Sequence, residues 1–159
     1  MLTHVLWIDS EEWKMFLREM SFQEKSAWIM ILALIISGFF YFSGVVHLSM
    51  SLGSLVPPLL PSLIKYTVTL VIISAVSHIV MAAMNPKEAN QKLDERERGI
   101  FDRAGHWSGF ILGFGVVMAL GGYLFSYNGD IMFYTILATL MLAQIAEYVL
   151  RIVFYRKMM

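Results

Sequence analysis

The sequence has no cysteine and few charged residues, and each shortage excludes a class of protein. Without cysteine, the chain has no disulfide, no thiolate metal site and no cysteine nucleophile. Charged residues make up 15% of the chain, against about 25% in an ordinary soluble domain. The formal net charge is zero, so no excess of positive charge points to nucleic acid as a partner.

Catalytic motifs are also missing from the sequence. It contains no HExxH helix, no GxSxG nucleophile elbow and no glycine-rich phosphate loop after a strand. We therefore expect a protein that is not an enzyme and that holds no cofactor. The N-terminus lacks the basic start of a signal peptide, so we expect Met1 to belong to the mature protein.

Apolar residues make up 58% of the chain and are gathered into long stretches. Four of these stretches have about 20 residues each, enough to cross a bilayer core of ~30 Å. The sequence therefore predicts an all-α, polytopic membrane protein in which residues 1–159 form a single membrane domain. The predicted transmembrane helices are residues 26–46, 63–84, 104–127 and 131–154.

Residues 1–20 are too polar to span a membrane but have one apolar helical face. Its members stand at i, i+3, i+4 and i+7: Trp13, Phe16, Leu17 and Met20. This spacing predicts an amphipathic helix in the membrane interface. A helix packed on the protein's own cytoplasmic face fits the pattern equally well. Ser21 and Glu24 then form a capping-box pattern ahead of the first span.

The distribution of basic residues predicts the orientation. Eleven of the 12 lysines and arginines lie in the N-terminal segment, the central charged segment or the C-terminal end, and only Lys65 lies elsewhere. The positive-inside rule then places both termini and residues 86–103 in the cytoplasm. Phe22 and Trp28 precede the first span as Phe101 and Trp107 precede the third, which favours two hairpins related as a parallel repeat.

Residues 86–103 are predicted to form a charged cytoplasmic helix. Asp94, Arg98 and Asp102 stand four residues apart, so charges of alternating sign share one helical face. A solvated surface is the favoured interpretation of this face. The sharper hypothesis is a docking surface for a membrane-protein partner, with six charged members: Asp94, Glu95, Arg96, Arg98, Asp102 and Arg103.

The third span carries the glycine row Gly105, Gly109 and Gly113, in a GxxxGxxxG pattern. Glycine at this spacing lets two helix backbones approach closely within lipid. We favour contact with the chain's other spans over a seam between copies in a homo-oligomer. A second row of small residues, Gly115 and Ala119, runs beside the first.

Polar side chains inside a bilayer are costly and often functional. Five of them are expected at similar depth near the cytoplasmic leaflet: His78, His106, Gln144, Glu147 and Arg151. The favoured interpretation is structural, with an intrahelical Glu147–Arg151 ion pair. Two alternatives stay open: a proton-linked or small-solute path lined by Glu147 and His78, and a metal or haem site formed by His78 with His106 or Glu147.

The segment Asp94-Glu-Arg-Glu97, followed by Ile100 and Arg103-Ala104, resembles one found in a group of small uncharacterised bacterial inner-membrane proteins. Members of that group carry a D-E-R-[DE]-x-x-I-x-x-[RK]-A segment between membrane hairpins. The resemblance covers the central third of the chain. It implies a bacterial inner membrane and four spans, and it implies no substrate. Gly105 and the long apolar loop before the second span depart from the group.

Taken together, these features predict a non-enzymatic membrane protein that acts through helix–helix assembly. Its partner would be a second copy or another membrane protein to which it is an accessory subunit or regulator. The alternative is a small proton-linked transporter or channel that uses Glu147 and His78.

Overall fold

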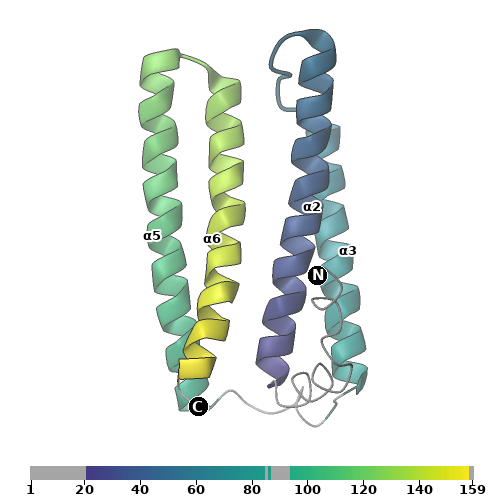
Figure 1. The fold of residues 1–159 in the computed structure, drawn as a ribbon, viewed down its shortest axis with the longest axis vertical. Coiled ribbons are helices and arrows are strands. Elements are labelled where there is room, and N and C mark those ends of the chain that lie inside the picture. The colour runs from purple at the N-terminus through teal and green to yellow at the C-terminus, as the bar shows by residue number, and fades with distance from the viewer. Residues whose placement is uncertain (1–20, 85, 87–93, 158–159) are drawn as a thin grey trace, which may run out of the picture.

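The computed structural model describes residues 21–84, 86 and 94–157, and within them the chain is all-helical. Four helices follow one another, and each is long and apolar enough to cross a membrane (Figure 1). They are α2 (Phe22–Leu52), α3 (Leu60–Met84), α5 (Glu95–Ser126) and α6 (Gly129–Lys157). The prediction of an all-α fold with four helices of membrane-spanning length and composition is confirmed. The amphipathic helix predicted for residues 1–20 lies outside the described residues.

Capping boxes start two of the helices. The Ser21 hydroxyl accepts a hydrogen bond from the Glu24 backbone N–H at 3.2 Å, and the Glu24 carboxylate accepts one from the Ser21 N–H at 3.1 Å. Asp94 and Glu97 repeat the arrangement at the start of α5. Each box satisfies donors that a helix N-terminus otherwise leaves unpaired. The box at Ser21 confirms the sequence prediction, whereas the one at Asp94 was not predicted.

The first hairpin differs from its predicted boundaries. The sequence predicts that the first span ends at Val46 and that the second begins at Leu63, but α2 continues to Leu52 and α3 begins at Leu60. Gly53, with φ of 69°, ends it in the left-handed conformation that glycine adopts easily. Pro61 lies in the first turn of α3, where its missing N–H is not needed. The loop is therefore shorter than predicted.

The charged segment and the third span form one continuous helix of 32 residues. This helix begins at Glu95, so the predicted start at Pro86 is wrong for α5, and residues 87–93 lie outside the described part of the chain. At its other end Tyr127 takes a left-handed conformation, with φ of 50°. The Asn128 side chain then accepts hydrogen bonds from the backbone of Asp130 and Ile131, which starts α6.

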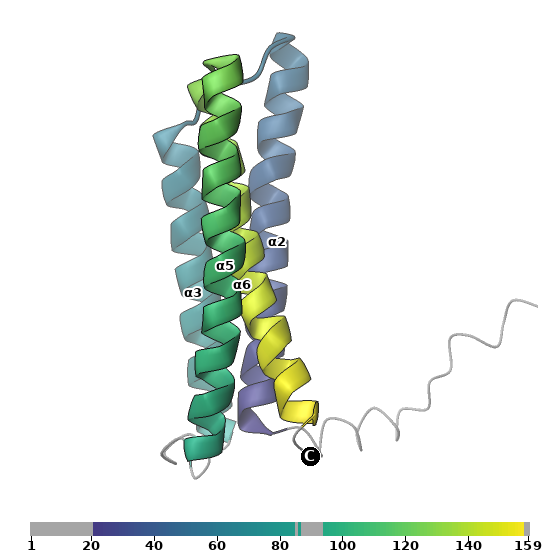
Figure 2. The same cartoon turned by 90° about the vertical axis from the view of Figure 1, so that its left-hand side faces the viewer.

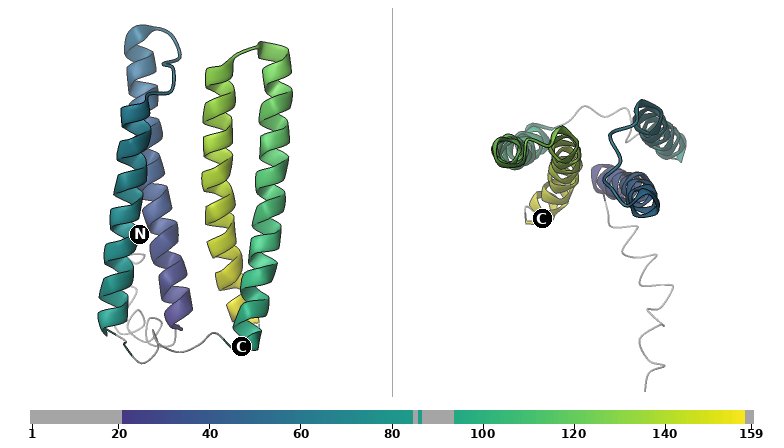
Figure 3. Two further views of the ribbon diagram at one scale, coloured as in Figure 1. Left: turned by 180° about the vertical axis from the view of Figure 1, so that it is seen from behind. Right: turned by 90° about the horizontal axis from the view of Figure 1, so that it is seen from above.

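The two hairpins, α2–α3 and α5–α6, run in the same direction (Figures 1 and 2). Their connecting loops lie at one end, called here the hairpin end. The starts of α2 and α5 and the ends of α3 and α6 lie at the other, called the basic end. Helix α6 packs against both α5 and α2, and α2 packs against α3. Seen from above, the helices form an open row, with α5 and α3 at its two ends (Figure 3).

Two apolar clusters hold α2, α3 and α6 together. Ala27, Ile31 and Ile152 join α2 to α6 in the half near the basic end. Tyr41, Tyr66 and Met141 join α2, α3 and α6 in the half near the hairpin end. Between α5 and α6, a side chain at Gly115 would collide with Thr139, so glycine is what permits the close approach there.

Candidate functional site

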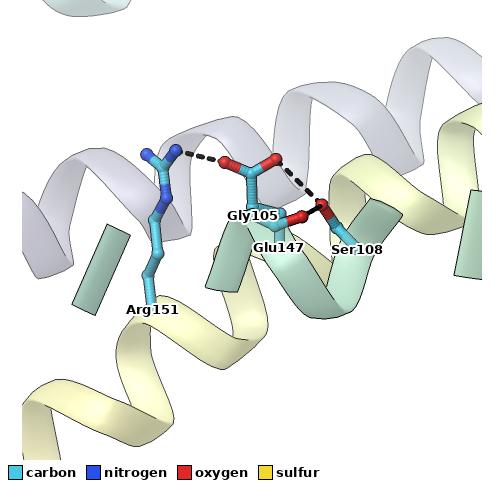
Figure 4. Close-up of polar contacts among 4 residues, drawn as sticks. All are labelled: Gly105, Ser108, Glu147 and Arg151. Atoms are coloured by element: carbon cyan, nitrogen blue, oxygen red, sulfur yellow. Dashed lines mark hydrogen bonds and ion pairs between the residues drawn. The ribbon is translucent and has the colours of Figure 1, made fainter. Parts of the chain in front are cut away.

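A polar cluster joins α5 to α6 in the half of the molecule near the basic end (Figure 4). Glu147 forms an ion pair with Arg151, one turn further along α6, and their side chains are only 18% and 22% exposed. The other carboxylate oxygen of Glu147 is 3.3 Å from the hydroxyl of Ser108 on α5. That hydroxyl is also 3.0 Å from the Gly105 carbonyl, and its single hydrogen serves one acceptor at a time.

The guanidinium of Arg151 is held by aromatic rings as well as by Glu147. Its central carbon lies 4.1 Å from the centre of the Phe101 ring on α5 and 5.0 Å from that of Tyr148 on α6. Such cation–π contacts gain strength when the cation is desolvated. The Arg151 Nε is buried without a hydrogen-bond partner. The Arg151 side chain on α6 therefore contacts both the Glu147 carboxylate and the Phe101 ring, and the ring contact connects α6 to α5.

Two further carboxylates connect helices at the basic end. Glu24 is only 2% exposed, and its Oε1 lies 3.5 Å from Nε of Arg156 on α6. Glu97 accepts a hydrogen bond from the hydroxyl of Tyr155 at 3.0 Å. Both glutamates also belong to the capping boxes of α2 and α5. The sequence predicts the box at Glu24 but not these contacts between helices, because a capping pattern indicates only the local partner.

His78 lies apart from this cluster, between α2 and α3. Its Nδ1 is 2.8 Å from the Ser74 carbonyl, which only accepts, so Nδ1 carries the proton and donates. Its Nε2 is 3.2 Å from the Ser26 hydroxyl, which is then the donor. Both ring nitrogens of His78 are thus engaged in hydrogen bonds within the chain.

The structure therefore brings together some of the five predicted polar residues and not others. Glu147 and Arg151 are in contact, and Ser108, which no sequence pattern predicted, is the third member of the cluster. Gln144 is exposed, and His106 is exposed with its ring edge-on to Phe110 at 4.9 Å. Across the described residues, no group of three or more metal-ligating side chains comes together. Of the five residues, Glu147 and Arg151 are thus in contact, whereas the contacts of His78 and His106 are with other side chains.

The glycine row of α5 also lies on an unexpected face. A Cβ built at Gly105, Gly109 or Gly113 would have open space around it, with nothing within 4 Å. The favoured prediction, contact with the chain's other spans, is therefore wrong for this row. Helix α5 packs on α6 through the neighbouring row of small residues instead: Ala104, Ser108, Gly115 and Ala119. A small-residue spacing identifies a face suited to close packing but not the helix that occupies it.

The charged residues proposed for docking all lie at the exposed start of α5. The six are Asp94, Glu95, Arg96, Arg98, Asp102 and Arg103. Asp94 is the N-cap of the helix, and its carboxylate accepts a hydrogen bond from the Glu95 N–H at 2.7 Å. Ile100 and Ala104 of the same helix are buried.

No protein-family model, curated protein or solved structure matches this chain.

Proposed function

We propose that this chain is a non-enzymatic protein of a bacterial inner membrane that acts by assembling with a second copy of itself through α5. The observation that carries the proposal is the glycine row Gly105, Gly109 and Gly113, around which the described part of the chain leaves open space. Within lipid, helix association depends on close packing rather than on the hydrophobic effect, and glycine rows supply it.

The surroundings of the row support the proposal. Helix α5 is at one end of the open row of helices, so the other three described helices cover only one of its sides (Figure 3). Large apolar side chains flank the glycines and are exposed: Phe110, Phe114 and Val117. They would pack around a helix seated on the glycines, which is the usual arrangement of a glycine-based helix pair.

The proposed orientation places the basic end in the cytoplasm. The lysine and arginine bias supports it, because seven of the eight basic residues in the described part of the chain lie in the half near that end, and the positive-inside rule follows such a bias. The bacterial inner membrane is supported by the resemblance of residues 94–104 to the group of small membrane proteins. The exposed charges at the start of α5 would then face the cytoplasm and be accessible to a partner protein.

The contacts give no support to the transport alternative. A proton path needs titratable groups that face one another or a shared cavity. Glu147 is paired with Arg151 between α5 and α6, whereas His78 is bonded to Ser26 between α2 and α3.

The proposal is tested by measuring the oligomeric state of the full chain in lipid vesicles, by energy transfer between labelled copies. Wild type is expected to associate, and Gly109→Leu is expected to weaken association at least ten-fold because the side chain blocks the approach of the backbones. Gly122→Leu is the control. Gly122 is also exposed, with open space around it, but it lies roughly 3.6 turns further along α5 and so on another face.

A monomeric wild type would overturn self-assembly. If wild type associates but Gly109→Leu and Gly122→Leu associate equally well, the contact between copies lies elsewhere than on the glycine row. Glu147→Ala is expected to leave association unchanged, because its side chain faces α5 within the same chain.

A further inference from the structure

A cavity of about 500 Å³ lies between α2 and α3, in the half of the molecule near the hairpin end. Its size is typical of small-molecule sites. The wall is mostly apolar, with Ile36 and Phe40 from α2 and Ile73 from α3. Phe40 is 71% exposed, so the cavity opens toward the surrounding lipid. An apolar chain that enters sideways from the bilayer would find matching walls.

One buried polar group in this cavity has no partner. Tyr41 is 7% exposed and lines the cavity, and its hydroxyl makes no hydrogen bond. A buried hydroxyl without a partner is costly, so such groups usually mark a site for a missing ligand or water. The nearby Tyr134 hydroxyl is already engaged, since it donates to the Val56 carbonyl at 2.9 Å. The cavity therefore offers a hydrogen-bond donor to an oxygen atom within it.

A positive charge lies on the same wall. Lys65, in the second turn of α3, lines the cavity and is exposed. It is the only basic residue in the segments predicted at the hairpin end. No carboxylate among the described residues forms an ion pair with it. An anion at this position would meet an unneutralised ammonium group where the helix emerges from the apolar layer.

From these three features we propose that the cavity between α2 and α3 is a binding site for one anionic phospholipid. Lys65 holds the headgroup phosphate, Tyr41 donates to an ester carbonyl below it, and one acyl chain lies along Ile36, Phe40 and Ile73. Along a phospholipid, the charged headgroup is followed by the esters and then by the hydrocarbon chains. From its rim inward, the cavity presents the matching groups: Lys65, then the Tyr41 hydroxyl, then the apolar wall. A neutral lipid fills the apolar part but leaves Lys65 without its counter-charge.

The test measures lipid binding to the full-length chain in neutral detergent by native mass spectrometry. Phosphatidylglycerol is the anionic probe and phosphatidylcholine the neutral one. Wild type is expected to bind one phosphatidylglycerol about ten-fold more tightly than phosphatidylcholine, which is the size of one charge-assisted hydrogen bond. Lys65→Gln is expected to remove this preference. Its control, Lys157→Gln, changes an exposed lysine at the basic end and should keep it.

Tyr41→Phe separates a binding role from a packing role. Removing an unpaired buried hydroxyl should leave the thermal stability of the lipid-free protein unchanged or slightly raised. The same change should weaken phosphatidylglycerol binding several-fold, because the carbonyl loses its donor. Tyr127→Phe, at an exposed tyrosine outside the cavity, is the control and should change neither quantity.

Three results would overturn the proposal. One is a preference for phosphatidylglycerol that survives Lys65→Gln and disappears in Lys157→Gln, which would place the lipid at the basic end. Another is a loss of thermal stability in lipid-free Tyr41→Phe with no change in binding. The third is displacement of phosphatidylglycerol by equal concentrations of oleate, which would assign the cavity to a free fatty acid.

Discussion

The carboxylate of Glu24 combines two tasks in a position that is 2% exposed. It caps the start of α2 and pairs with Arg156 of α6, whose side chain is 47% exposed. We expect Glu24→Ala to lower the free energy of unfolding by about 1–3 kcal/mol, because it removes a cap and a buried acceptor. Arg156→Ala should cost under about 1 kcal/mol, since water screens its charge. Denaturant titration in detergent measures both.

Glu95→Ala is the control for Glu24, because Glu95 is an exposed acid in the first turn of α5. It should change the free energy of unfolding by less than about 0.5 kcal/mol. Equal losses for Glu24→Ala and Arg156→Ala would mean that the ion pair, and not the cap, supplies the stability.

The pair Glu147–Arg151 gives a second prediction at the scale of residues. Glu147→Leu leaves the cation of Arg151 largely buried with only ring contacts, and we expect a loss of about 2–3 kcal/mol. Arg151→Met should cost a similar amount, because it leaves the carboxylate. The double variant should lose less than either single variant, since no uncompensated charge remains. Thermal unfolding of the three variants measures the coupling, and additive losses would exclude it.

The contacts of a side chain could be predicted from the sequence only where its partner is a few residues away in the chain. The Glu147–Arg151 pair and the box at Ser21 join residues three or four positions apart, so their spacing was sufficient to predict them. The contact from Ser108 to Glu147 joins residues 39 positions apart. Its formation depends on how α5 and α6 are rotated, which no local pattern specifies.

At the scale of elements, α5 has two rows of small residues with different partners. A Cβ at Gly115 would meet Thr139 of α6, whereas a Cβ at Gly109 would meet no atom of the described residues within 4 Å. We expect Gly115→Ala to lower the free energy of unfolding of the monomer in detergent by about 1–3 kcal/mol, because the added methyl group overpacks the contact. Gly109→Ala should leave it unchanged within about 0.5 kcal/mol. A loss for Gly109→Ala alone would reverse the assignment of the two rows.

The number and approximate positions of the helices could be predicted from the sequence. The residues at which they end, and the faces through which they pack, were harder to predict. Apolar runs of about 20 residues predict spans because the bilayer thickness requires that length. The end of α2 at Leu52 was missed because a helix continues past the apolar layer until a residue such as Gly53 stops it. The face used by α5 was missed because rows at Gly105 and Gly115 fit the same small-residue pattern.

At the scale of the whole molecule, the four helices form an open row in which α3 and α5 each keep an uncovered side. In a soluble protein such exposure of apolar residues would favour aggregation. In a bilayer, lipid chains can solvate apolar helix faces. Close packing and polar contacts between helices therefore decide which faces are covered by a neighbouring helix. The polar contacts of the basic end hold α2, α5 and α6 together there, through Glu24, Glu97 and Glu147.

The orientation of the whole molecule gives the last prediction. With no cysteine in the sequence, single cysteines can be introduced without a background. Ser54→Cys lies in the exposed loop at the hairpin end, and Lys157→Cys lies at the basic end. If the basic end is cytoplasmic, a membrane-impermeant maleimide added to intact spheroplasts should label Ser54→Cys and should label Lys157→Cys only after lysis. Labelling of Lys157→Cys in intact spheroplasts, with Ser54→Cys protected, would show the opposite orientation. Lys65 would then lie at the cytoplasmic leaflet.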